Sequence, residues 1–195
     1  MGIVELLGLA GSVSLIAGWR LYLTIFVTGM AMRLQWISLP EHLQVLDAFA
    51  NPWVLAISAF AALAEFFADK ILWLDSAWDT IHTAIRPVGG ALLALAVVDA
   101  SDPAWQVIVF LLGGGAALMS HGAKSGARAL VNTSPEPVSN AVVSTGEDIA
   151  SGGLLVLAFA NPVAALIIAL ALLCLCLLLV YKGYRLWRRI VSSGN

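Results

Sequence analysis

Several long segments of this chain are almost entirely apolar, and short polar stretches separate them. A helix needs about 20 mainly apolar residues to cross the hydrocarbon core of a bilayer. Of the 195 residues, 61% are hydrophobic and 11% are charged, whereas soluble domains carry roughly 25% charged residues. A soluble protein of this size could not bury so much apolar surface. The sequence therefore predicts an all-α fold, a polytopic transmembrane helix bundle.

Polar stretches and prolines divide the chain into about six predicted spans within a single transmembrane domain, 1–195. Asn-Pro pairs at 51–52 and 161–162 each open an apolar segment, where proline has no helical N–H to lose. Residues 99–103 and 132–137 are predicted loops, and 36–50 are predicted to be a surface helix or a re-entrant turn. The predicted spans are 3–32, 52–67, 77–98, 104–131, 138–158 and 162–189.

Basic residues near the C-terminus predict the orientation of the bundle. Lys182, Arg185, Arg188 and Arg189 follow the last apolar segment, and cytoplasmic segments of membrane proteins carry an excess of lysine and arginine. An even number of spans then places both termini in the cytoplasm. The lipid bilayer is the expected partner. The net charge of −2 gives no reason to expect nucleic acid, and a homo-oligomer is compatible with the sequence but not indicated by it.

Two short motifs recur and allow two interpretations. Phe-Ala-Asn-Pro occurs at 49–52 and again at 159–162, and Gly-x-Arg occurs at 18–20 and again at 126–128. Inverted internal repeats are common in transporters, so a duplicated fold is one interpretation. Chance is the other, because short matches are frequent in a chain of limited composition. A count of six spans also gives the two Asn-Pro helices the same direction.

Most charges within the predicted helices fall on narrow stripes. Asp75, Asp79, His82 and Arg86 are spaced three or four residues apart, so they share one helix face. A charge that faces hydrocarbon costs about 2.5–3.5 kcal/mol on insertion scales, so the stripes should face one another inside the bundle. The predicted polar cluster comprises Arg20, Glu65, Asp69, Lys70, Asp75, Asp79, His82, Arg86, His121, Lys124, Arg128, Asn132, Asn140, Ser144, Glu147 and Asp148.

Three functions fit such a cluster, and transport is the preferred one. A small transporter or channel-like protein would hold an ion or small polar solute in a cytoplasm-facing polar cavity, with Arg20 and Arg128 as anion contacts. A structural or accessory membrane protein would use the same residues as a buried ion-pair network. A metal-assisted enzyme acting on lipid headgroups would use Asp75, Asp79 and His82 as metal ligands. The common hydrolase and nucleotide-binding motifs are absent, and no catalytic residue or cofactor is predicted.

The motifs around these charges resemble a known family of bacterial membrane proteins, domain of unknown function 4126. The resemblance covers nearly the whole chain and implies a multi-pass protein of the bacterial inner membrane, with no known activity, substrate or cofactor. Leu72 stands where the family commonly has proline. The motifs are Gly18-Trp19-Arg20, Ala64-Glu65, Asp69-Lys70-Ile71, Asp75, Asp79, His82, Arg86-Pro87 and Gly89. One subgroup is similar at His121-Gly122-Ala123-Lys124, Arg128, Asn132-Thr133-Ser134-Pro135, Asn140 and Glu147-Asp148.

Overall fold

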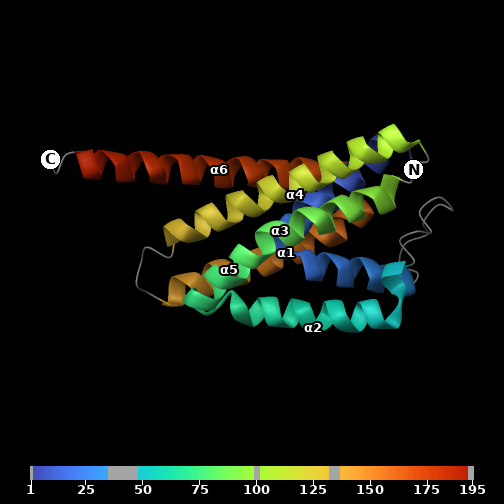
Figure 1. Ribbon diagram of the computed structural model, residues 1–195, viewed down its shortest axis with the longest axis horizontal. Helices are drawn as coiled ribbons and strands as arrows, with labels where there is room; N and C mark the ends of the chain where they lie inside the picture. The colour runs from blue at the N-terminus through green and yellow to red at the C-terminus, as the bar shows by residue number, and fades with distance from the viewer. Residues whose placement is uncertain (1, 35–47, 99–101, 132–136, 193–195) are drawn as a thin grey trace.

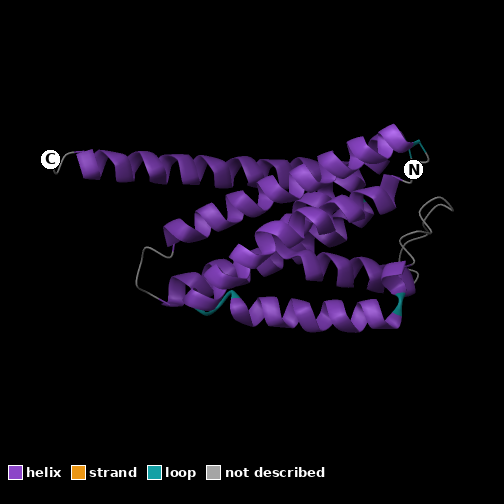
Figure 2. Cartoon of the chain, in the orientation of Figure 1, coloured by secondary structure: helices purple, strands orange, loops and turns teal. Residues whose placement is uncertain are grey.

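The computed structural model describes residues 2–34, 48–98, 102–131 and 137–192, and these residues form six helices and no strand (Figures 1 and 2). Five helices are long and apolar enough to cross a membrane, and α2 is shorter, with 17 residues. The prediction of an all-α polytopic bundle is confirmed. The helices are α1 (Ile3–Arg33), α2 (Pro52–Ala68), α3 (Leu72–Val98), α4 (Pro103–Val131), α5 (Pro137–Ala160) and α6 (Pro162–Ser192).

The helix boundaries follow local signals at most ends. Asn51 Oδ1 accepts a hydrogen bond from Trp53 N at 2.9 Å, and Asn161 Oδ1 accepts one from Ala164 N at 3.1 Å. Each asparagine therefore caps the helix that its proline opens. The third helix begins at Leu72, earlier than the predicted start at 77, because the chain turns tightly after α2. The predicted surface helix or re-entrant turn at 36–50 lies outside the described residues, except for 48–50.

The central helix α1 is broken at Arg20, and its two halves fold back toward the same end of the bundle. Arg20 has φ −143° and ψ 76°, far from helical values. A Cβ on Gly8, in the first half, would lie 3.1 Å from Pro162 at the start of α6. Gly29, in the second half, lies against Phe49 and Leu55 near the start of α2. In Figure 1 the dark-blue and lighter-blue halves meet inside the bundle, so the segment predicted as one span turns back there.

This reversal changes the topology that the sequence suggested. In Figure 1 the N-terminus and the C-terminus lie at opposite ends of the bundle. This differs from the prediction that both termini lie on the same side, and the reason is that α1 returns to the end where it started. Helices α2 and α6, which carry the recurring Asn-Pro pair, run in the same direction (Figure 1), so they are not related by inversion.

Small residues let the first half of α1 approach α3 and α4 closely. A Cβ on Gly18 would lie 2.3 Å from the carbonyl oxygen of Ala117 on α4, which is closer than real Cβ contacts allow. Ser120 Oγ donates to the Leu15 carbonyl at 2.7 Å, and Ser14 Oγ donates to the Gly90 carbonyl at 3.0 Å. Close backbone approach with hydroxyl bridges is the usual way in which helices associate in lipid.

The substitution Gly18→Ala is therefore expected to destabilise the protein by about 1–3 kcal/mol, the usual cost of overpacking a tight interface. The added methyl group meets backbone atoms of α4, which cannot rotate away. Thermal unfolding in detergent measures the effect. Gly122→Ala is the matched control, since a Cβ at Gly122 on α4 meets nothing within 4 Å. Equal stability of the two variants would contradict the close contact between Gly18 and the backbone of α4.

Candidate functional site

The predicted polar residues with described side chains lie in or beside one buried network at the break in α1. They come from five helices and the turn after α2, and the ion pairs join residues far apart in sequence. Asn132 and the side chain of Asn140 lie outside the described part of the chain. The network is nearly balanced in sign. Its basic members are Arg20, Lys70, Arg86, Lys124 and Arg128, and its acidic members are Glu65, Asp69, Asp75, Asp79, Glu147 and Asp148.

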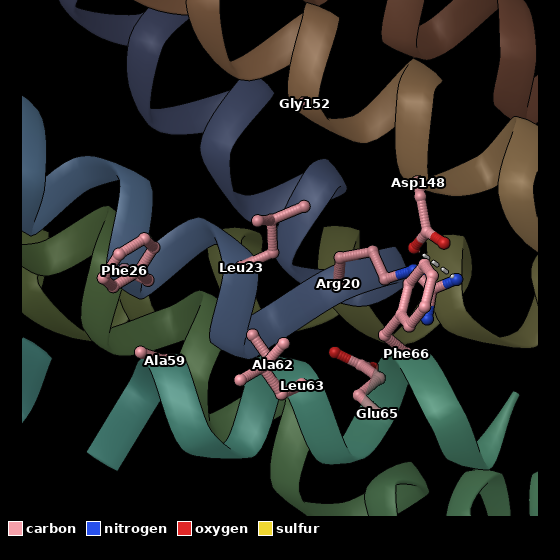
Figure 3. A pocket seen from close by; sticks show the side chains of 10 residues that line it. All are labelled: Arg20, Leu23, Phe26, Ala59, Ala62, Leu63, Glu65, Phe66, Asp148 and Gly152. Carbon is pink, nitrogen blue, oxygen red and sulfur yellow. Dashed lines mark ion pairs between the residues drawn. The ribbon is translucent and has the colours of Figure 1, made fainter. Parts of the chain in front are cut away.

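Arg20 joins the turn after α2 to α5. Its side chain is 2% exposed, and its Nη1 pairs with the carboxylate of Asp69. Its Nη2 lies 2.8 Å from Asp148 Oδ1 and donates to the Ser144 carbonyl at 3.4 Å. Figure 3 shows the Arg20 side chain extending from the break in α1 to Asp148. A buried guanidinium can be retained only with such partners, because an unpaired charge in this position would be costly.

Arg86 on α3 is the second centre of the network and is fully buried. Its Nη2 lies 2.5 Å from Glu65 Oε1 on α2, and its Nη1 lies 3.3 Å from Asp79 Oδ1. Its Nη1 also lies 2.5 Å from His121 Nδ1. Arginine can only donate, so His121 Nδ1 is the acceptor and the ring proton sits on Nε2, which faces the Asp79 carbonyl at 3.2 Å.

Lys124 and Arg128 on α4 connect the turn after α2 to α3 and α5. Arg128 Nε lies 3.1 Å from Asp75 Oδ2, and Arg128 Nη1 lies 2.8 Å from Glu147 Oε2. Lys124 Nζ lies 3.3 Å from Asp69 Oδ2. The carboxylate of Asp69 thus contacts cations from both α1 and α4, which ties the broken helix to the rest of the bundle.

Side chains of the network also bind the backbone carbonyls that the break in α1 exposes. A helix end leaves carbonyl groups without helical partners. The Gly18 carbonyl accepts from Arg86 Nη1 at 3.3 Å, and the Trp19 carbonyl accepts from Lys124 Nζ at 3.3 Å. The Arg20 carbonyl accepts from Thr24 Oγ1 at 2.7 Å. Cations are favourable at the C-terminal end of a helix dipole, so the basic residues stabilise the break itself.

Asp69, in the turn between α2 and α3, is held in its charged form. Burial alone would raise the pKa of its carboxyl group. The positive charges of Lys124, Arg20 and Arg128 outweigh that effect and hold the pKa below its ordinary value. The folded state therefore binds the proton of Asp69 less tightly than the unfolded chain does.

Acid is expected to destabilise the protein through Asp69. The stabilisation from its lowered pKa is complete above the ordinary value of 3.8 and is lost as the pH falls through the folded pKa. Each unit of pKa difference corresponds to about 1.4 kcal/mol. Thermal unfolding in detergent from neutral to acidic pH should show that Asp69→Asn is less stable at neutral pH and loses less stability on acidification. Asp102→Asn, at an exposed helix cap, should follow the wild type. An Asp69→Asn profile parallel to the wild type would contradict this assignment.

The enzyme hypothesis requires Asp75, Asp79 and His82 to point toward one metal position, and their side chains do not. Asp75 faces Arg128, and Asp79 faces Arg86 and accepts from Ser125 Oγ at 2.7 Å. Both ring nitrogens of His82 have other partners, the Trp78 carbonyl at 2.7 Å and the Tyr22 hydroxyl at 2.9 Å. Within the described ranges, no three His, Cys, Asp or Glu side chains gather as metal ligands would.

The structure adds polar and aromatic residues that the sequence analysis did not include. Ser125 follows His121 by four residues, and Thr83 follows Asp79 by four and lies 3.1 Å from His121 Nε2. Both continue polar stripes already identified, so the same spacing could have found them. Tyr22 reaches His82 only because α1 turns beside it, and nothing in the local sequence marks that contact.

The chain matches the family described as Domain of unknown function (DUF4126) over residues 7–182. The chain belongs to this family. The match covers nearly all of α1 and the whole of α2–α5, so every part of the charge network lies inside the DUF4126 region. No curated protein and no solved structure matches the chain.

Cavities border the network of this DUF4126 chain on several sides. One of about 470 Å³ lies between the second half of α1, α2 and α5, with Arg20, Glu65 and Asp148 at its polar end. One of about 220 Å³ lies between α3 and α4, and seven of its eight lining residues are polar or charged, among them Asp75, Asp79, Ser125 and Arg128. One of about 450 Å³ lies between α4, α5 and α6, with Lys124 and Glu147 in its wall.

Proposed function

We propose that this DUF4126 protein is a small transporter or channel-like protein that binds an ion or a small polar solute beside its charge network. The observation that carries the proposal is the break in α1 at Arg20, deep in the bundle. The Gly18 carbonyl beside the break binds Arg86, and Arg86 in turn binds Asp79 in the wall of the cavity between α3 and α4. Discontinuous helices place half-helix ends at the solute and ion sites of many transporters. Irregular backbone at membrane depth is tolerated only where it is buried in protein or lines a cavity, and Arg20 meets both conditions.

The solute site is the polar cavity between α3 and α4. Asp75 and Asp79 would contact a cation or exchange a proton there, and Arg128 would contact an anionic group. Hydroxyl groups of Thr83 and Ser125 in the same wall can donate or accept hydrogen bonds. A polar wall of mixed charge suits an ion or a small polar solute better than it suits an apolar molecule.

The site faces the cytoplasm of the cell in this proposal. Lys182, Arg185 and Arg188 are exposed near the end of α6, and an excess of basic residues favours the cytoplasmic side. The ends of α2, α4 and α6 and the starts of α3 and α5 lie at that same end of the bundle (Figure 1). The N-terminus then lies on the opposite face. The bacterial inner membrane is the proposed location, from the family resemblance.

Transport is tested with the isosteric change Asp79→Asn in proteoliposomes. A pH-sensitive dye inside the vesicles reports proton-coupled flux, and radiolabelled ions and small polar solutes report flux without protons. Wild-type protein should move at least one member of the panel, and Asp79→Asn should slow proton-coupled flux by about a hundredfold or more, the usual scale for loss of a proton-transferring group. Asp102→Asn is the matched control, because Asn also caps helices well and Asp102 lies outside the network.

A structural role is the second candidate, and the dense pairing of the network favours it. Each basic side chain of the network has a carboxylate within 4 Å. A purely structural network requires only that the charges be paired, so Asp79→Asn would lower thermal stability without any solute-dependent effect. Wild-type vesicles that move no member of the panel, together with a destabilised Asp79→Asn variant, would replace the transport proposal by the structural one.

A further inference from the structure

The cavity between the second half of α1, α2 and α5 is apolar over most of its wall and polar at one end. Leu23 and Phe26 on α1, together with Ala59 and Phe66 on α2, form the apolar part. Figure 3 shows Phe26, Leu23 and Ala59 toward one end, and Phe66 beside Arg20 at the polar end. Its volume of about 470 Å³ lies within the range of about 300–1,000 Å³ that small-molecule sites occupy.

Two buried polar atoms at the polar end have no hydrogen-bond partner among the described residues. They are Oε2 of Glu65 and Nε of Arg20. Both side chains line the cavity and are at most 2% exposed, and Figure 3 shows the Glu65 carboxylate pointing from α2 toward α1. A buried polar atom without a partner is costly. Both atoms are closed to solvent as the structure stands, so a group in the cavity reaches them through a small rotation of the two side chains and can then satisfy one acceptor and one donor.

The two unsatisfied atoms, one acceptor and one donor, determine which chemical group could bind to both. A hydroxyl group can donate to Glu65 Oε2 and accept from Arg20 Nε. A cation can satisfy only the carboxylate and would be repelled by Arg20. An anion can satisfy only Arg20 and would be repelled by Glu65 and Asp148. A neutral hydroxyl group at the polar end is thus the chemistry that fits both atoms.

The apolar wall and its position indicate that the ligand carries a hydrocarbon chain and comes from the bilayer. Leu63 lines the cavity and is 58% exposed, so the wall continues onto the face of α2 that would contact lipid. Helix α2 packs mainly on α1, which leaves its side toward α5 open to the cavity. We infer that this cavity binds a neutral amphiphile, with its hydroxyl group between Arg20 and Glu65 and its chain among the apolar side chains. The inference does not depend on transport.

Photolabelling of the full-length protein in lipid nanodiscs tests the inference. The probe is an alkyl alcohol with a diazirine in its chain, and mass spectrometry locates the labelled peptides. Labelling should be saturable and should map to α2 and α5. Octanol should compete, and octyl methyl ether should compete about tenfold less well, because the ether cannot donate to Glu65. Competition by dioleoylglycerol added to the nanodisc would support a bilayer lipid as the source, and competition by octanol without competition by dioleoylglycerol would contradict it.

Two neighbouring glycines of α5 provide a matched pair of variants. A Cβ at Gly152 or at Gly153 meets nothing within 4 Å, but only Gly152 lines the cavity. Gly152→Leu should reduce labelling of α2 and α5 at least tenfold, and Gly153→Leu should leave it unchanged. Both variants have the same change in helix propensity, so a folding effect would appear in both. The absence of saturable labelling, equal competition by octanol and the ether, or unchanged labelling of Gly152→Leu would each overturn the inference.

Discussion

Replacing Arg20 by alanine is expected to destabilise the folded protein by about 3–5 kcal/mol, the usual cost of removing one partner of a buried ion pair. The change leaves the carboxylate of Asp69, which is fully buried, with less positive charge around it, and removes the nearest cation of Asp148. It also removes the side chain that links the break in α1 to α5. Yield of folded protein and thermal unfolding in detergent measure the loss.

Two further variants show whether geometry or charge accounts for this loss. Arg20→Lys keeps the charge but not the planar fork, so it should recover only part of the stability, because lysine cannot reach Asp69, Asp148 and the Ser144 carbonyl together. Arg33→Ala, at the exposed end of the same helix, is the control and should be nearly neutral. If Arg20→Ala and Arg33→Ala behaved alike, Arg20 would not hold α1 in place.

Replacing Arg86 by methionine should cost a similar amount, about 3–5 kcal/mol. Glu65 is 1% exposed and has Arg86 as its ion-pair partner at 2.5 Å, so the single change leaves a carboxylate buried without compensation. The double variant Glu65→Met with Arg86→Met removes both charges and should cost less than the two single changes added together, by an interaction free energy of about 1–3 kcal/mol. Denaturant unfolding of the wild type, the two single variants and the double variant measures this energy.

Arg86 differs from its partner in what else it contacts. It also binds Asp79, His121 and the Gly18 carbonyl, whereas Glu65 has Arg86 as its only ion-pair partner within the described chain. Glu65→Met should therefore cost less than Arg86→Met. If the stability losses of the two single variants added up to the loss of the double variant, the two charges would not interact in the folded protein. That outcome would contradict the short distance between them.

The polar network could be predicted from the sequence to a large extent, and the reason is helical periodicity. Asp75, Asp79, His82 and Arg86 share a face because of their spacing, and lipid around the bundle forces that face inward. Spacing does not determine partners across helices. The pairs Arg86 with Glu65 and Arg128 with Asp75 depend on the tilt and rotation of whole helices, which local sequence does not encode. Asn132 and Asn140 remain predictions.

The break in α1 is the feature that could not be predicted from the sequence. No proline stands near Arg20, and although Gly11, Gly18 and Arg20 interrupt the apolar run, they do not predict that the helix turns back. The break is stabilised by Arg86 and Lys124, which bind the carbonyl groups of Gly18 and Trp19 from other helices. Tertiary contacts here override local helix preference. For the same reason the number of crossings could not be counted from hydropathy, because α1 is long enough to cross yet turns back.

The fold of α1 also has a consequence for how the protein is made. Arg20 is synthesised first, and its partners Asp69 and Asp148 follow on later segments of the chain. Until α5 leaves the ribosome, the guanidinium group lacks its full set of carboxylates, and placing such a charge in hydrocarbon costs about 2.5–3.5 kcal/mol on insertion scales. The earliest helix to be translated therefore gains its full set of ion-pair partners only after α5 has been made. The centre of the bundle becomes complete only when nearly all of the protein has entered the membrane.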